Sequence, residues 1–508
     1  MHNQEENGVA VTTVTSNKIS KERGKTMKNE KTSLNIRKLK KQVKGITLIA
    51  LVVTIIVLLI LAGVAINLTV GDNGLFKRAQ NAVYTYEGAS EKEAIEMLLA
   101  ANFIDSVSGK QISKEELEET LKNQFGDKIN VEDNGDGSFL VTIDENQYYL
   151  GEDGELIDST NMVKISTADE LKTFRDDVNS GNTYEGKYVY LTDDITLNSS
   201  EEWEPIGYYS QDTESIRKVL ENEKNKPFSG TFDGKNHTIN NMYINNNNKV
   251  QGFFGLVIDG NIKNINIAEN CSINAGGNSG SVVGYMYNTG RINNCKNYAD
   301  LNRAGGGIVG HVAGSITVSN CINYGDIQNG SGGIIDSSNG TDWEEFANVQ
   351  HTIMNCANYG SITSTIDQDY VGGIVGFFKG NILNSFNLGN IENKGSSSQN
   401  WTGGIAGEIY GNAENCYNIA DINGVYCTGG IAGVLTGYIM NCYSIANISG
   451  GYEIGDIFGY VTNDDDSEIV NCYSKKDSFN AGNLGNTYVD DTENINQGYP
   501  ILKWQKNN

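Results

Sequence analysis

An internal repeat in the C-terminal part of the chain limits the possible folds more than any other feature. A block that reads Gly-Gly-Ile-Val/Ala-Gly recurs with starts 29, 26, 26, 40, 31, 26 and 26 residues apart. The starts, of which the first two and the last are degenerate, are Gln251, Gly280, Gly306, Gly332, Gly372, Gly403, Gly429 and Gly455. A second block, an apolar residue followed by a spacer, Asn, Cys, a spacer and Asn, recurs in the same order, as in Ile292 to Asn297. A fixed period of this size indicates a repeat architecture.

The length of the unit predicts a stack of strands. About three strands of four to six residues fit into such a unit, and none of them can bury its apolar side alone. If each unit forms one coil, equivalent strands pair in parallel at about 4.8 Å and like residues lie over like residues. Parallel crossovers are nearly always right-handed. We therefore predict a mainly β fold, a right-handed parallel β-helix of roughly ten coils from Gly186 to Tyr499, with a helix starting at Thr167 over its first coil.

Equivalent positions then form columns along the solenoid. Two columns are predicted to be buried apolar ladders: Ile308, Ile334, Ile374, Ile405, Ile431 and Ile457 in one, and Leu301, Ile327, Ile362, Ile391, Ile422 and Ile448 in the other. The recurring Asn is predicted to stack amide on amide at a corner, where glycines allow close turns.

A further column contains six of the eight cysteines: Cys295, Cys321, Cys356, Cys416, Cys442 and Cys472. Neighbouring coils could bring these residues within disulfide range, so vertical pairing is one interpretation. Ser385 occupies the same position in one repeat, which favours the other interpretation, a column of small buried thiols.

Near the N-terminus a basic arm is followed at once by an apolar segment. No charged residue occurs from Ile46 to Leu68, and a helix of this length reaches ~35 Å, enough to cross a ~30 Å hydrocarbon core. The eleven Lys and Arg residues between Lys18 and Lys44 favour a cytoplasmic N-terminus. We predict a single-pass protein of the cell membrane that contacts the lipid bilayer through residues 46–68 and has the bulk of its chain outside the cell.

The boundary between the two segments, Gly45-Ile46-Thr47-Leu48-Ile49-Ala50-Leu51, resembles the cleavage region of type IV prepilins. The resemblance implies that a prepilin peptidase cuts after Gly45 and methylates Ile46, and that the helix serves as anchor and filament stave. The family usually has Glu at the fifth mature position, where this chain has Ala50, which favours a minor pilus or pseudopilus component over a main subunit. The alternative is an uncut signal anchor. Met27 offers a second plausible start.

Four regions are predicted along the chain. Residues 1–45 are the basic leader, and residues 46–105 are the transmembrane or pilin-like helix and a stalk. Residues 106–160 form a small α+β unit that opens with a capping box at Ser113. Residues 161–508 form the repeat β-helix with its N-terminal capping helix.

The repeats resemble the GLUG motif of bacterial surface proteins over roughly Met162 to Trp504. The lead-in Phe228 to Gly234 and the tail Gln497 to Pro500 are similar to the usual start and end of such arrays. The resemblance implies a solenoid at the surface of a bacterium. It implies no activity, because such repeats occur in proteins of different function.

Charge and motif content limit the function classes. The formal net charge is -25, so nucleic acid is not expected as a partner. Three of the four histidines, His237, His311 and His351, occupy unrelated repeat positions, and His2 lies in the leader. The sequence contains no H-E-x-x-H, G-x-S-x-G or C-x-x-C motif. We predict no catalytic residues, no cofactor and no metal site.

Aromatic residues in the insertions are the candidate ligand-binding residues. Tyr370 and Trp401 each lie two residues before a Gly-Gly pair and are predicted to stack on adjacent coils, and Trp343 lies in a separate longer loop. Exposed aromatic faces suit sugar rings. The alternative is that these rings only cover their own loops.

The sequence thus predicts a membrane-anchored, pilin-like extracellular surface protein whose β-helix serves adhesion or display, with a cell-surface glycan or protein as ligand. The alternative is a glycan-active lyase or hydrolase on the same scaffold, which needs a cleft with paired acids or a basic residue beside a metal. A pseudopilin of a secretion machine would share the N-terminus but does not require so large a repeat domain.

Overall fold

The computed structural model describes Ile95, Glu96 and residues 113–507, apart from 136, 144–145, 152–153, 212–217, 249, 339–350, 366–369, 398–399, 463–466, 476–483, 485–486, 494–495 and 497. The predicted leader, the boundary at Gly45 and Ile46, the apolar segment 46–68 and Trp343 lie outside these residues. Among the residues described, no helix is long and apolar enough to cross a membrane.

A helix and a four-stranded antiparallel sheet precede the repeats. The helix α4 (Lys114–Phe125) begins at a capping box between Ser113 and Glu116 and leads through η1 (Gly126–Lys128) into the sheet. The strands lie in the order of the chain: β1 (Ile129–Asp133), β2 (Phe139–Ile143), β3 (Asn146–Leu150) and β4 (Leu156–Asp158). Leu117 and Leu121 of the helix pack on Val131 and Val141 of the sheet, which gives this region its own small core.

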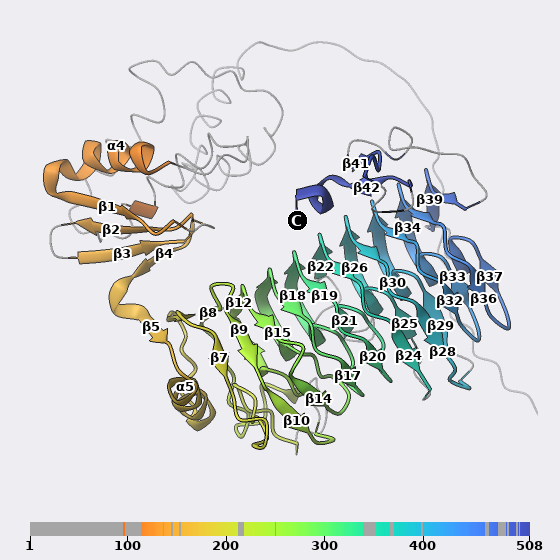
Figure 1. Ribbon diagram of the computed structural model, residues 1–508, viewed down its shortest axis with the longest axis horizontal. Helices are drawn as coiled ribbons and strands as arrows, with labels where there is room; N and C mark the ends of the chain where they lie inside the picture. Colours follow the sequence, from red (N-terminus) through yellow and green to blue (C-terminus); the bar gives the residue numbers. More distant parts are fainter. Residues whose placement is uncertain are drawn as a thin grey trace, which may run out of the picture. The chain divides into compact units, whose positions relative to one another are not determined.

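The repeats form a mainly β solenoid of about ten turns over residues 162–474, in which every pair of neighbouring strands is parallel (Figure 1). The ten-strand sheet takes one strand from each turn: β7 (Ile195–Thr196), β9 (Thr238–Asn240), β13 (Asn266–Ile267), β16 (Lys296–Asn297), β19 (Ile322–Asn323), β23 (Ala357–Asn358), β27 (Phe386–Asn387), β31 (Tyr417–Asn418), β35 (Tyr443–Ser444) and β40 (Tyr473–Ser474).

The eight-strand sheet forms a second side of the solenoid. Its strands are β10 (Tyr243–Asn245), β14 (Ser272–Asn274), β17 (Leu301–Asn302), β20 (Ile327–Gln328), β24 (Ile362–Ser364), β28 (Ile391–Asn393), β32 (Ile422–Asn423) and β36 (Ile448–Ser449). A four-strand sheet follows it in the last turns: β25 (Tyr370–Gly372), β29 (Trp401–Gly403), β33 (Thr428–Gly429) and β37 (Ile454–Gly455).

The fourteen-strand sheet forms the remaining side. Its strands are β5 (Met162–Ile165), β6 (Tyr188–Leu191), β8 (Thr231–Asp233), β11 (Phe254–Ile258), β12 (Asn261–Lys263), β15 (Val283–Asn293), β18 (Val309–Ser319), β21 (Ile335–Ser338), β22 (His351–Met354), β26 (Val375–Leu383), β30 (Ala406–Glu414), β34 (Ala432–Met440), β38 (Phe458–Val461) and β39 (Glu468–Val470). Some turns contribute two strands to this sheet, as β21 and β22 do between β18 and β26.

The core consists of the columns that the repeat predicts. The isoleucines that follow each Gly-Gly pair are fully buried from Ile308 to Ile431 and belong to one continuous cluster. The Asn stack is also confirmed: the side-chain amide of each member donates to the side-chain carbonyl of the next over 2.8 Å, through Asn297, Asn323, Asn358, Asn387 and Asn418. All eight cysteines are free; seven are buried and Cys472 is half-buried. The thiol interpretation of the cysteine column is therefore the one observed.

A second column of Asn explains how each turn bends into the ten-strand sheet. Its members adopt a left-handed backbone with φ between 49° and 55°, which Asn tolerates better than most residues. They are Asn294, Asn320, Asn355, Asn384, Asn415, Asn441 and Asn471.

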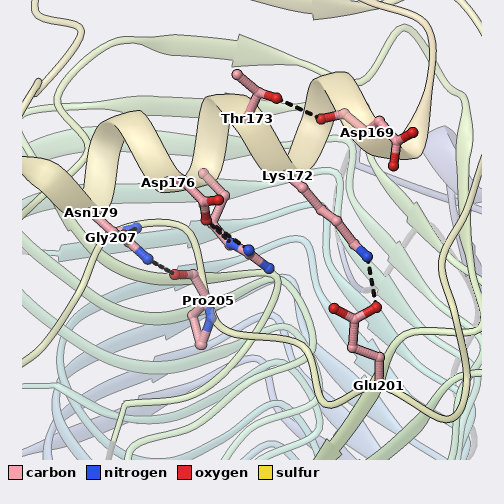
Figure 2. A network of polar contacts seen from close by, with 9 residues as sticks. Asp169, Lys172, Thr173, Asp176, Asn179, Glu201, Pro205 and Gly207 are labelled. Carbon is pink, nitrogen blue, oxygen red and sulfur yellow. Dashed lines mark hydrogen bonds and ion pairs between the residues drawn. The ribbon is translucent and has the colours of Figure 1, made fainter.

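The helix α5 (Ala168–Ser180) covers the first turn. A capping box between Thr167 and Glu170 starts it, and Leu171, Phe174 and Val178 enter the solenoid core. Figure 2 shows how the helix is attached to residues 201–207: Lys172 forms an ion pair with Glu201 at 2.7 Å. The Asn179 side chain donates to the carbonyl of Pro205 at 3.1 Å and accepts from the amide of Gly207 at 2.9 Å.

The solenoid ends earlier than predicted. The turns stop at Ser474, and the next strands, β41 (Tyr488–Val489) and β42 (Ile501–Leu502), pair antiparallel before η5 (Lys503–Asn507). This C-terminal segment packs on the outer side of the ten-strand sheet, because that side presents the aromatic rings of Phe386, Tyr417 and Tyr443. The Trp504 indole lies 5.4 Å from the Phe386 ring and donates to the carbonyl of Asn384 at 2.8 Å.

Candidate functional site

A groove crosses the outer side of the eight-strand sheet over four successive strands, β24, β28, β32 and β36. We call it the lateral groove; its volume is about 460 Å³. Its lining residues are Ser361, Thr363, Asn390, Ile391, Glu392, Asp421, Ile422, Asn423, Asn447, Ile448 and Ser449. Because these strands are parallel and in register, equivalent side chains repeat along the groove at about 4.8 Å.

One column of the groove is held in place by the main chain. The side chain of Asn390 accepts from the amide of Asp421 at 3.0 Å, and the carboxylate of Asp421 accepts from the amide of Asn447 at 3.0 Å. Each of these side chains lies just before a strand and accepts from the amide of the equivalent residue in the next turn. Their orientation is therefore fixed before any ligand binds.

A second column points its polar groups outward. Glu392 is in register with Thr363 on one side and Asn423 on the other, and the hydroxyl of Ser449 donates to Asn423 at 3.0 Å. Glu392 forms a surface ion pair with Lys394 at 2.9 Å. The residues that line the groove are hydroxyl, carboxamide, carboxylate and aliphatic groups, with no basic residue among them. This chemistry suits a neutral ligand rich in hydroxyl groups and disfavours an anionic one.

The aromatic pair predicted from the insertions lies on the turns that also form the groove. Tyr370 opens β25 and Trp401 opens β29, and the two residues are register partners on adjacent turns. Their ring centroids are 5.3 Å apart at an interplanar angle of 69°, and Tyr370 also contacts Phe377 at 5.4 Å. The predicted placement on adjacent turns is confirmed, whereas the predicted ligand contact stays a prediction. The next register position after Trp401 is Cys427, which has no aromatic ring. This column of register partners therefore contains two rings in the described turns.

A longer aromatic ladder lies elsewhere on the solenoid. The rings of Tyr298 and Tyr324 are 4.8 Å apart and those of Tyr324 and Tyr359 are 5.0 Å apart, nearly parallel in both cases. Each tyrosine directly follows the last Asn of a second repeat block, a sequence signal that could have revealed the ladder. Stacked rings cover one another's faces, so this ladder offers mainly edges to a ligand.

The buried histidines do not form a shared column. His311 is in register with Ser337, whose hydroxyl lies 2.9 Å from its Nδ1, while His351 is in register with Gly380. Burial lowers the pKa of each histidine to about 3, so both are neutral at physiological pH.

In two carboxyl groups burial shifts the pKa upward, whereas in the histidines it shifts the pKa downward. Burial raises the pKa of Glu408 to about 7 and that of Asp336 to about 6. Asp336 stands where most repeats have the last glycine of the first block and bonds to the hydroxyl of Ser331. The two residues lie on β30 and β21, which β26 separates in the sheet.

Metal binding finds no support in the residues that the structure describes, since no three His, Cys, Asp or Glu side chains are grouped to hold an ion there. A comparison of the sequence with protein families finds no matching family, and a search of curated proteins finds no match. The resemblances to prepilins and to GLUG repeats therefore rest on the motifs alone.

Proposed function

We propose that the chain is a membrane-anchored, pilin-like surface protein whose right-handed solenoid binds a neutral glycan and so serves adhesion. The lateral groove is the observation that carries the proposal. It spans four turns, or about 14 Å along the solenoid, which matches a short oligosaccharide. Its amide and hydroxyl groups are held in position by neighbouring turns, as at Asn423 and Ser449, so little ordering is needed on binding.

The anchoring part of the proposal rests on the sequence. Residues 46–68 are long and apolar enough to span a bilayer, and the Gly45-Ile46 boundary supplies the processing site. Ala50 favours a minor pilus or pseudopilus component. A solenoid carried on such a helix would present the groove outside the cell.

Binding of the full-length protein to soluble polysaccharides tests the groove. The probes are a β-glucan and a galactomannan, with polygalacturonate as the anionic comparison. We expect binding to a neutral probe and none to polygalacturonate. Asn423→Ala should weaken binding about tenfold, because one hydrogen bond to a ligand hydroxyl is lost.

Asn302→Ala is the matched control, since Asn302 lies in the same outer column two strands before the groove and bonds to its neighbour Asn274 in a similar way. Equal loss of binding in both variants, preference for polygalacturonate, or no binding to either neutral probe would reject the groove as a glycan site.

A second candidate function, a glycan-active enzyme, is favoured by the raised pKa of Glu408 and Asp336. A carboxyl group whose pKa is raised toward neutrality keeps a larger protonated fraction than usual, and its protonated form can act as a general acid in glycoside cleavage. Release of reducing sugar from the same probes, lost in Glu408→Gln, would establish this function. Binding without release of sugar would favour the adhesion proposal.

A further inference from the structure

The lateral groove repeats one small unit in each of its turns. Every turn supplies two outward polar residues with an isoleucine between them, as in Asp421, Ile422 and Asn423 of the turn that contains β32. The outward residues form two columns along the solenoid. The first column is Ser361, Asn390, Asp421 and Asn447, and the second is Thr363, Glu392, Asn423 and Ser449.

The two columns have regular spacings. The strands that carry them are parallel and in register along the whole groove (Figure 1). Equivalent side chains are therefore about 4.8 Å apart along the solenoid axis. The two columns are about 6.6 Å apart across the groove, because they lie two residues apart on each strand. Each turn thus offers one pair of polar residues at the same distance from the pair before it.

The floor between the columns is smooth. Ile391 and Ile422 are each 1% exposed, because their side chains point into the core of the solenoid. The backbone of these turns forms the floor, and neither isoleucine side chain protrudes from it. A chain of linked rings can therefore lie along the groove over these turns.

The first column keeps polar atoms for a ligand in fixed positions. The Oδ1 of Asp421 accepts from both the amide and the side chain of Asn447, at 3.0 and 2.8 Å, and the Oδ1 of Asn390 accepts from the amide of Asp421. Within the described chain, the Oδ2 of Asp421 and the Nδ2 of Asn390 make no further hydrogen bond. Neighbouring turns thus present an acceptor and a donor, a combination that suits hydroxyl groups.

We propose that the lateral groove binds an extended β-(1→4)-linked neutral glycan parallel to the solenoid axis, with one sugar ring in each of its four turns. This inference rests on the proposed function and adds the linkage, direction and length of the ligand. The bonds of such a chain leave opposite sides of each ring equatorially, so the rings follow a nearly straight line. They advance by a distance close to the spacing of the turns.

The presence of two polar columns also fits this linkage. Successive rings of a β-(1→4)-linked chain are turned over, so a given hydroxyl edge faces the two columns alternately. Both columns carry polar side chains in every turn of the groove, so each ring meets hydrogen-bonding groups on both sides. An α-(1→4)-linked chain curves, because one bond of each linkage is axial, and it would leave the straight groove.

Titration of the full-length protein with oligosaccharides tests the proposal. The probes are cello-oligosaccharides and β-(1→4)-manno-oligosaccharides, each from disaccharide to hexasaccharide. Malto-oligosaccharides of the same lengths are the control, because they differ from the cello-oligosaccharides only in the linkage. We expect at least one β-linked series to bind, with an affinity that rises about threefold or more per ring up to the tetrasaccharide and then levels off. The malto-oligosaccharides should bind at least about tenfold more weakly.

A variant at one end of the groove tests the direction of the chain. Ser449→Ala removes a polar group from the last turn, so the affinity should level off at the trisaccharide instead of the tetrasaccharide. Ser449 is exposed, so the fold should tolerate this change. Asn302→Ala changes the second column outside the groove and should leave the levelling at the tetrasaccharide.

Several results would overturn this inference and leave the proposed function standing. They are equal affinity for the malto-oligosaccharides, an affinity that stops rising at the disaccharide or still rises at the hexasaccharide, and an unchanged levelling in Ser449→Ala. Binding of neither β-linked series would also overturn it. In that case the neutral polysaccharide probes decide separately whether the groove is a glycan site.

Discussion

The Trp401 indole lies edge-on to the Tyr370 ring on the preceding turn, with ring centroids 5.3 Å apart. Both residues are half-buried, so each ring keeps part of its surface in solvent. An edge-on pair covers less ring face than a parallel stack such as that of Tyr298 and Tyr324. The pair is thus better suited than the longer ladder to contact a sugar ring.

The double variant Tyr370→Ala with Trp401→Ala should abolish binding to glycans or cells without lowering the melting temperature by more than a few degrees. The rings are near the surface, and an aromatic pair of this kind contributes only about 0.5–1.5 kcal/mol beyond its buried area. Tyr298→Ala with Tyr324→Ala is the matched control and should leave binding intact. Unchanged binding, or a large loss of stability in the first variant alone, would return the pair to covering its own loops.

The buried Asn stack should contribute strongly to stability. Asn358 accepts from Asn323 and donates to Asn387 and to the carbonyl of Gly360, each over 2.8 Å. Asn358→Ala removes these bonds inside the core and should lower the free energy of unfolding by about 2–4 kcal/mol. Urea unfolding measures this loss, and Asn302→Ala, which changes a half-buried Asn with one hydrogen bond to Asn274, should cost less than about 1 kcal/mol. Similar values for the two variants would show that the stack is not a main source of stability.

Glu408 should make the protein less stable at alkaline than at acidic pH. Burial raises its pKa from the ordinary 4.5 to about 7. The folded state therefore holds a proton that the unfolded state releases between these values, and the stability from the protonated group is lost as pH rises through about 7. Glu408→Gln cannot ionise, so it should match the parent at pH 4 and exceed it by about 1–3 kcal/mol at pH 8.

Glu414→Gln, on the same strand, is the control for charge removal, and the gain of Glu408→Gln is measured relative to it at each pH. Urea unfolding of the three proteins at both pH values gives the comparison. A gain for Glu408→Gln that is equal at the two pH values would contradict burial of an ionisable group.

The repeat spacing is sufficient to predict the turns, the isoleucine columns, the Asn stack and the placement of Tyr370 beside Trp401. Each depends on residues one period apart, and parallel stacking brings such residues together without further information. The lateral groove could have been found in the same way, because Asn390, Asp421 and Asn447 share one column, but their polar character alone did not single them out.

The end of the solenoid could not be predicted from the period. The second block still appears at Cys472, although the chain leaves the stack after Ser474. The C-terminal segment then packs on the outer side of the ten-strand sheet, where Trp504 contacts Phe386 and Asn384, about 120 residues earlier in the sequence. Such contacts follow from the shape of the finished outer surface and not from local pattern. The raised pKa of Glu408 likewise follows from burial between turns.

Mass spectrometry of the N-terminus, on protein taken from its native membrane, most directly tests the claim that the solenoid is presented outside the cell on a processed helix. The mature chain should begin at N-methylated Ile46, and Gly45→Val should block the cut while the protein still inserts into the membrane. Recovery of intact residues 28–44 on surface-exposed protein would contradict it.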